Sequence, residues 1–228
     1  MQSRVRLFAA PPFVIITALS LGLTGCSPMV IDESAVFLPP AYIDNAPRMG
    51  LAGEAQLRVD GITIEHDVLK TNFGPLAITR ASRQNTEGET RPLILNCMGN
   101  ASDRWSAGAA YIRNAIDYGD VIVFDYPGYN QSAGGATEED FDAAVTAWVD
   151  WLAATAPTEN RPLIAWGQSL GGFICSEIVS RSDVFDGVII ETSAQNAEQV
   201  AASWIPWFAK PFLRVEIKES LRAYDSAN

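Results

Sequence analysis

Four short apolar runs, separated by segments with helical periodicity, constrain the fold of this chain more than any other feature. The runs are residues 92–95, 121–124, 163–166 and 188–190. Apolar residues recur at helical spacing in the segments between them, 104–118, 141–152 and 170–181. Strands that are apolar on both faces and alternate with helices form right-handed βαβ units. The sequence therefore predicts an α/β protein with a mostly parallel central sheet flanked by helices.

A different pattern precedes the first apolar run. Apolar and polar residues alternate over 55–60, 62–69 and 76–81, and the turns between these segments contain Gly61 and Gly74. Strict alternation is typical of strands with one buried face, and glycine-containing turns join such strands in hairpins. We therefore expect antiparallel strands at the N-terminal edge of the sheet.

The third apolar run enters its helix through the sequence Gly-Gln-Ser-Leu-Gly, residues 167–171. Strand and helix backbones crowd such a turn, so both glycines are needed and the central residue, Ser169, is strained and exposed. The same five residues could form a structural Gly-Ser turn. Their position between a strand and a helix favours a nucleophile elbow instead, with Ser169 as the nucleophile.

Three stretches together resemble the α/β-hydrolase superfamily, in particular its serine-aminopeptidase-like and palmitoyl-thioesterase-like branch. They are Asn-Cys-Met-Gly-Asn-Ala at 96–101, Asp-Tyr-Pro-Gly-Tyr-Asn-Gln-Ser at 125–132 and Gly-Gln-Ser-Leu-Gly-Gly at 167–172. The resemblance covers about residues 55–228. It implies an α/β-hydrolase fold for residues 51–228, lacking the last two βα units of the family.

The resemblance also implies roles for particular residues. The backbone N–H groups of Asn100 and Leu170 would form the oxyanion hole. Met98 stands where the family usually has a histidine, and both donors are main-chain groups that this replacement need not remove. Asp125 is expected to hold its turn rather than to act as the catalytic acid.

A general base for Ser169 is missing from this pattern. The sequence contains a single histidine, His66, which precedes Ser169 by about a hundred residues and falls on an expected exposed edge strand. The family order is nucleophile, acid, then histidine. Glu191 follows the fourth apolar run, where some members place the acid, but no histidine follows it.

The family pattern implies two further βα units beyond Asn228, the first carrying Asp and the second His. We therefore expect either a truncated sequence or a homologue without a triad. The aromatic segment within 194–223 corresponds to a possible cap. It could form a lid over an acyl pocket, a membrane-contacting patch, or helices that pack on further units.

The N-terminus has the features of a secretory signal. Arg4 and Arg6 precede an uncharged apolar stretch, and the sequence Leu-Thr-Gly-Cys ends at Cys26. This ending resembles the bacterial lipobox, which implies a signal peptide over 1–25 and acylation of Cys26. An ordinary cleaved signal or an anchoring helix is the alternative.

A lipid anchor at Cys26 would place the protein in the bacterial envelope on the periplasmic side. Ser27 after the cysteine favours the outer membrane. Residues 26–50 contain four prolines and no sustained period, so we interpret them as a tether.

Charge and cysteine content narrow the remaining functions. The net charge of −11 argues against nucleic acid and anionic lipid surfaces as electrostatic partners. Besides Cys26, only Cys97 and Cys175 are present, and we expect two apolar core residues rather than a disulfide. One histidine and two cysteines predict no metal site and no cofactor.

The sequence thus predicts a serine hydrolase that acts on carboxylic ester, thioester or small amide bonds of a small acyl substrate, through an acyl-enzyme at Ser169. The alternative is a non-catalytic envelope lipoprotein, a degenerate or truncated hydrolase domain used for binding.

Overall fold

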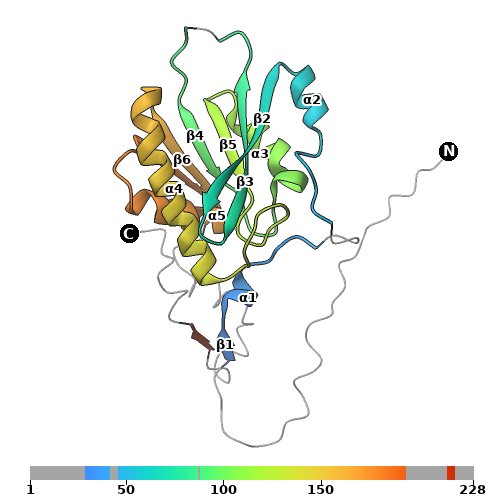
Figure 1. Ribbon diagram of the computed structural model, residues 1–228, viewed down its shortest axis with the longest axis vertical. Coiled ribbons are helices and arrows are strands. Elements are labelled where there is room, and N and C mark those ends of the chain that lie inside the picture. The colour runs from blue at the N-terminus through green and yellow to red at the C-terminus, as the bar shows by residue number, and fades with distance from the viewer. Residues whose placement is uncertain (1–28, 42–45, 87, 194–214, 219–228) are drawn as a thin grey trace, which may run out of the picture.

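The computed structural model describes residues 29–41, 46–86, 88–193 and 215–218. Its main element is a six-stranded sheet in the order β2-β3-β5-β4-β6-β7 (Figure 1). The strands are β2 (Ile62–Thr71), β3 (Gly74–Arg83), β4 (Leu93–Cys97), β5 (Asp120–Phe124), β6 (Leu163–Gln168) and β7 (Gly187–Glu191). The last four run parallel to one another, and β2 and β3 pair antiparallel at one side. The protein therefore has the predicted α/β-hydrolase type of sheet, with antiparallel N-terminal strands.

Helices cover both faces of this sheet and create two hydrophobic cores. The helices are α2 (Glu54–Val59), η1 (Arg104–Gly108), α3 (Ala109–Ala115), α4 (Glu138–Glu159) and α5 (Leu170–Ser180). One core joins α2 and α3 to one face, and the other joins α4 and α5 to the opposite face. All five residues of β4 are buried, as expected for a central strand covered on both sides.

Two expected elements differ in the structure. The alternating segment 55–60 forms α2, because Leu57 alone turns into the core and Gly53 begins the helix in a left-handed conformation. Three alternating apolar residues are compatible both with a short strand and with about one and a half turns of helix. The expected helix over 104–118 is a π-helical turn, η1, followed by α3, and Asp103 caps its start with a capping box.

Helix α4 contains the segment 141–152 that was expected to be helical, and a side chain caps its start. Thr137 is the N-cap residue, and its side chain accepts a hydrogen bond from the backbone N–H of Asp140 at 3.3 Å. Three acidic residues occupy the first turn, where their negative charges interact favourably with the positive end of the helix dipole. This helix runs the length of the sheet in Figure 1.

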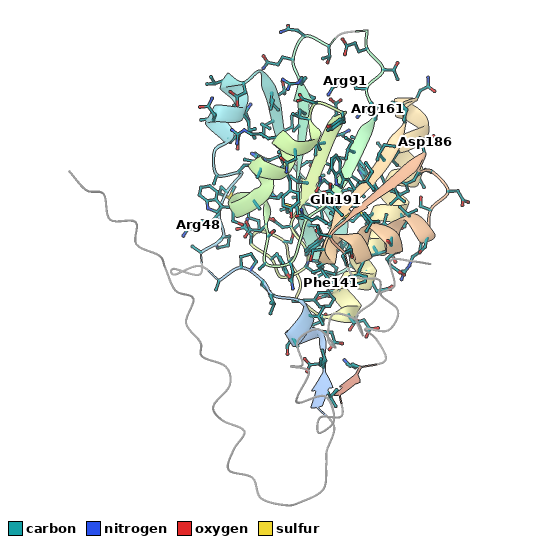
Figure 2. The ribbon with its side chains drawn as sticks, turned by 180° about the vertical axis from the view of Figure 1, so that it is seen from behind. Arg48, Arg91, Phe141, Arg161, Asp186 and Glu191 are labelled. Carbon is teal, nitrogen blue, oxygen red and sulfur yellow. A yellow bond between two sulfur atoms is a disulfide. The ribbon has the colours of Figure 1, made fainter. Side chains whose placement is uncertain are left out.

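Part of the segment expected to be a tether is packed on the domain. Strand β1 (Met29–Ile31) and helix α1 (Glu33–Val36) lie beyond one end of the main sheet (Figure 1). Phe37 follows them, is 2% exposed and stacks on Phe141 with ring centroids 4.0 Å apart. Figure 2 shows Phe141 close to where this segment meets the domain. Strand β1 pairs in parallel with β8 (Val215–Ile217).

Cys97 and Cys175 form a disulfide, which corrects the expectation of two separate core cysteines. Their Cα atoms are 5.9 Å apart. The bond forms because α5 turns back along the sheet directly after β6 and packs on the end of β4. Both cysteines are fully buried.

Several expectations fall on residues outside the described part. These are the signal peptide over 1–25, acylation of Cys26, and most of the cap segment 194–223. No helix in the described ranges is both long and apolar enough to cross a membrane.

Candidate active site

Ser169 occupies a sharp turn between β6 and α5. Its backbone has φ 53° and ψ −119°, a combination that costs a non-glycine residue about 1–3 kcal/mol. Hydrogen bonds of 2.9 Å hold this turn, from the Ser169 N–H to the carbonyl of Glu191 and from the Gly172 N–H to the Ser169 carbonyl. The Ser193 hydroxyl also donates to that carbonyl. Ser169 itself is exposed, so the fold fixes its backbone and leaves its side chain accessible.

The glycines around Ser169 are required by close backbone contact. A Cβ atom on Gly171 would lie 1.9 Å from the carbonyl oxygen of Cys97, and one on Gly167 would lie 2.4 Å from that of Gly171. A Cβ on Gly172 would lie 2.6 Å from Ser193. The start of α5 is therefore pressed against the end of β4, where the 98–100 loop begins.

Two tyrosines hold this loop, and one of them, Tyr111, links it to the elbow. The Tyr126 hydroxyl donates to the Met98 carbonyl, and the Gly99 N–H donates to the Tyr111 hydroxyl at 2.9 Å. Tyr111 in turn donates to the side chain of Gln168, the residue before Ser169. Burial raises the pKa of Tyr126 well above its ordinary value, so its hydroxyl remains a donor. Met98 is fully buried in the core, and the loop is held without the family's usual histidine.

Both polar atoms of the Asn100 side chain make hydrogen bonds. Its Oδ1 accepts from the backbone N–H of Leu38 and from the Tyr129 hydroxyl, each at 3.0 Å, and also from the Ala101 N–H. Its Nδ2 donates to the carbonyl of Val36. Within the described ranges, no acceptor is paired with the Asn100 backbone N–H. The N–H of Leu170, at the first position of α5, has no intrahelical acceptor either. The two predicted oxyanion donors thus lie on the 98–100 loop and on the start of α5, and the start of α5 contacts the end of β4, where this loop begins.

Asp125 lies at the end of β5 and has a structural environment. It is fully buried and accepts hydrogen bonds from the Arg104 backbone N–H at 2.6 Å and from its Nε at 3.1 Å. Asn130 also donates to it. Burial raises the pKa of Asp125, and the charge of Arg104 opposes that rise. These partners agree with the expected turn-holding role.

His66 is far from Ser169. The strand register puts His66 in one row with Trp166, which lies four strands away on β6. At roughly 4.8 Å per strand the separation is about 19 Å across the sheet alone. The ring of His66 is hydrogen-bonded through Nδ1 to the Thr79 hydroxyl and through Nε2 to the Glu54 carboxylate, each at 2.9 Å. The sequence has no other histidine, so these 228 residues supply no imidazole to Ser169.

Glu191 ends β7, where some family members place the catalytic acid, and Figure 2 labels it at this end of the sheet. Its carbonyl supports the elbow through the Ser169 N–H. In the described part, no cluster of three or more His, Cys, Asp and Glu residues is placed to hold a metal ion.

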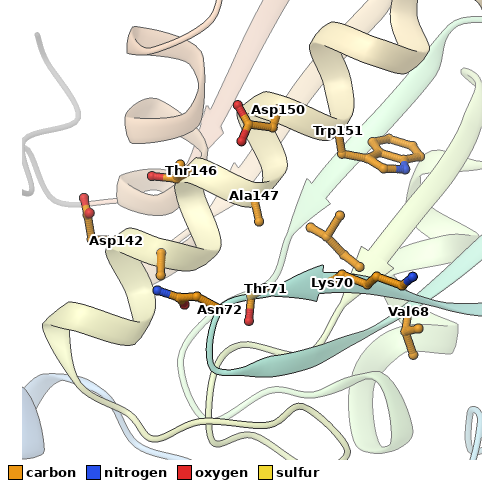
Figure 3. A pocket seen from close by; sticks show the side chains of 11 residues that line it. Val68, Lys70, Thr71, Asn72, Asp142, Thr146, Ala147, Asp150 and Trp151 are labelled. Atoms are coloured by element: carbon orange, nitrogen blue, oxygen red, sulfur yellow. The ribbon is translucent and has the colours of Figure 1, made fainter.

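A groove of about 780 Å³ lies at a different place, between β2 and α4 (Figure 3). Its lining includes Lys70, Thr146, Asp150 and Trp151, and Ser169 is not part of it. The groove therefore belongs to the edge of the sheet and not to the elbow.

The sequence profile described as alpha/beta hydrolase fold matches residues 93–221, more than half of the chain. The chain belongs to this family. The matched range includes the elbow, the 98–100 loop and the Asp125 turn. The protein is therefore an α/β hydrolase by sequence as well as by fold.

Curated relatives and solved structures agree with this assignment. The uncharacterized protein Rv2307c of Mycobacterium tuberculosis is 27% identical over 125 residues, 54% of this chain and 43% of that protein. The lysophosphatidylserine lipase ABHD12 of Gallus gallus is 27% identical over 123 residues, 51% of this chain and 32% of that protein. The matches thus span less than half of either relative. The esterase Pf2001 of Pyrococcus furiosus has a similar fold, with a TM-score of 0.53 and 16% identity over 77% of this chain and 65% of that chain.

Some residues that build the site of this α/β hydrolase were not evident from the sequence. Tyr111 carries no motif, and its contact with Gln168 depends on how α3 packs. Val36 and Leu38 act through backbone groups, which leave no trace in residue type. Tyr129 lies within the quoted 125–132 stretch, so the motif indicated its region but not its bond to Asn100.

Proposed function

We propose that Ser169 is the nucleophile of a serine hydrolase that cleaves carboxylic ester, thioester or small amide bonds. The observation that carries the proposal is the backbone of Ser169, strained at φ 53° yet held by hydrogen bonds, with the side chain exposed. A strained conformation persists only where surrounding structure determines it, and such positions cluster at active sites.

In this proposal the Ser169 hydroxyl attacks the acyl carbon, and the backbone N–H groups of Asn100 and Leu170 receive the negative charge on oxygen. The bond to the leaving group breaks as the acyl-enzyme forms, and the leaving group takes up the proton of the serine hydroxyl. Water then hydrolyses the acyl-enzyme, which releases the acid and restores the hydroxyl. Preorganised main-chain donors suit this step because they need no rearrangement when charge develops. The contact between Gly171 and the end of β4 supports the pairing of the two donors.

Among the three bond types, the relatives favour an ester. The Gallus gallus relative, which aligns with 51% of this chain, is a lysophosphatidylserine lipase. We infer an acyl ester substrate on this basis and leave the thioester and amide as competing substrates for the assay. Pocket shape on this fold is set by loops, so the fold itself does not choose among them.

We also propose that Cys26 is acylated and that the domain works on the periplasmic side of the envelope. The disulfide between Cys97 and Cys175 supports an oxidising compartment, since disulfides are rare in cytosolic proteins. Mass spectrometry of membrane-extracted protein should find a diacylglyceryl-modified N-terminus at Cys26. A soluble product, or one that retains Met1, would contradict the lipidation.

The experiment for the hydrolase uses the 228-residue chain and a fluorophosphonate probe, with the labelled peptide identified by mass spectrometry. Without an imidazole base, we expect labelling of Ser169 to be slow. Added imidazole should accelerate it by about tenfold, a part of what an enzymatic base supplies. The Ser169→Ala variant should lose the label, and Ser180→Ala, a serine at the end of the same helix, should keep it.

The competing function is a non-catalytic binding protein of the envelope, and the position of His66 favours it. If Ser169 stays unlabelled at high imidazole while the protein is folded, the hydrolase proposal fails and the binding protein remains. Brisk ester hydrolysis without imidazole would instead show that another group of this chain acts as the base.

A further inference from the structure

We propose that residues 31–38, which we call the brace, hold the 98–100 loop in position. They do so through hydrogen bonds to the side chain of Asn100. The proposal rests on the proposed function for the role of the Asn100 N–H, but the contacts themselves do not depend on it. The brace positions the site through the side chains of Ile31 and Phe37 and through the backbone groups of Val36 and Leu38. All of them lie sixty or more residues before the loop.

The link between brace and loop consists of two hydrogen bonds to one amide. The Leu38 N–H donates to Asn100 Oδ1 at 3.0 Å, and Asn100 Nδ2 donates to the Val36 carbonyl. The amide plane of Asn100 is therefore fixed from one side by backbone groups of the brace. The Tyr129 hydroxyl fixes it from the Asp125 turn, again at 3.0 Å.

The brace is itself anchored in the domain core. Ile31 is 7% exposed and Phe37 is 2% exposed, and both belong to the same hydrophobic core as Leu170 and Phe173 at the start of α5. Phe37 also stacks on Phe141 of α4. Brace and elbow thus share one core, so the brace can hold the 98–100 loop at a fixed place relative to Ser169.

The chemistry of the link explains why an amide suits position 100 at neutral pH. The amide of Asn100 offers a donor to the Val36 carbonyl and an acceptor to the Leu38 N–H at the same time, on two separate atoms and at neutral pH. An ionised aspartate has the same shape, but it would place a negative oxygen against the Val36 carbonyl. A side chain occupied in this way leaves the backbone N–H of Asn100 as the group that can meet an oxyanion.

Hydrogen exchange of the full chain, followed by mass spectrometry, tests the brace. In Asn100→Asp at neutral pH, amides of residues 98–101 should exchange about tenfold faster than in the wild type, the loss expected for about one net hydrogen bond. Phe37→Ala should have a similar effect. Leu38→Ala is the matched control, because the Leu38 side chain is 48% exposed while its N–H is retained. It should exchange like the wild type.

A second readout separates positioning from general destabilisation. Below the pKa of the new carboxyl, about 4 for an ordinary aspartate, Asn100→Asp regains a donor. Its loop exchange should then return to that of the wild type measured at the same pH. Unchanged loop exchange in both variants, or a uniform rise over β4 and β5 without recovery in acid, would overturn the brace. A failure of Ser169 to react with the probe would remove the hydrolase and leave this result untouched.

Discussion

The elbow of this protein and the β2 edge of the same sheet both carry residues suited to catalysis, yet they are built in different ways. At the elbow, backbone hydrogen bonds and close glycine contacts hold Ser169, and its side chain stays exposed. At the edge, side-chain bonds to Thr79 and Glu54 occupy both ring nitrogens of His66. Residue type alone therefore does not distinguish a candidate reactive site from a structural one. Position at the carboxyl ends of parallel strands, where ligands bind in open α/β sheets, favours the elbow as the candidate site.

A similar contrast separates two charged pairs that each have a member hydrogen-bonded to the Thr79 hydroxyl. One is Arg104–Asp125 at the end of β5, and the other is His66–Glu54 at the β2 edge. Arg104 and Asp125 are 2% and 0% exposed, whereas His66 and Glu54 are 36% and 23% exposed. Burial raises the pKa of Asp125 despite Arg104. Burial acts in the same direction on Glu54, but hydrogen bonds from Arg58 and His66 outweigh it and lower the pKa of Glu54. The loss of one partner should therefore lower the free energy of unfolding much more for the buried pair than for the partly exposed pair.

The largest expected effect is that of Arg104→Met. It leaves Asp125 buried without its counter-charge and removes donors to Gln131 and Thr79. We expect a loss of about 5 kcal/mol in the free energy of unfolding at pH 7.5, the upper end for breaking a buried pair. The matched edge variant, Arg58→Met, removes a 49% exposed partner of Glu54 and should cost about 0.5 kcal/mol. Denaturant titrations measure both.

The pH dependence of Arg104→Met checks the cause. Asp125 has a raised pKa in the folded protein, so its ionisation lowers stability as pH rises from its ordinary value of 3.8 through the folded pKa. Without Arg104 this pKa rises further. The difference from the wild type should therefore be smaller at pH 4.5 than at pH 7.5, and adding Asp125→Asn should recover part of the loss. An equal cost for Arg104→Met and Arg58→Met would remove the distinction between the buried and the partly exposed charged pairs.

The disulfide gives the second comparison, because it joins the two halves of the site and does not touch the edge. It closes a loop of 78 residues between Cys97 and Cys175. The Cys97→Ala/Cys175→Ala variant should lose about 4 kcal/mol of unfolding free energy in urea titrations. Hydrogen exchange should rise earlier at 97–101 and 170–175 than in the β2–β3 hairpin. An unshifted urea midpoint would show that the bond does not form in the native protein.

What the sequence could and could not predict follows the same division. The βαβ alternation and the elbow around Ser169 were evident, since buried parallel strands and a strand-to-helix turn leave local patterns. Helix α2 was mistaken for a strand because its short alternating pattern fits both structures. The disulfide was missed because Cys97 and Cys175 each fit an apolar core position. The brace was missed because it acts through backbone groups, whose partners only the folded chain brings together.

The smallest expected effect is that of His66→Ala, which tests whether the edge takes any part in the chemistry. The His66 side chain, which is hydrogen-bonded to Glu54, is 36% exposed. We therefore expect the free energy of unfolding to fall by less than about 1 kcal/mol at pH 7. The lowered pKa of Glu54 gives a contribution that is fully present above its ordinary value of 4.5 and is lost as pH falls through the folded value. The difference between variant and wild type should therefore shrink below pH 4.5 in urea titrations. Imidazole-assisted labelling of Ser169 should be unchanged in His66→Ala, as in the exposed-strand control Glu65→Ala. Loss of labelling in His66→Ala alone would make the distant histidine a participant, which a separation of about 19 Å across the sheet does not allow.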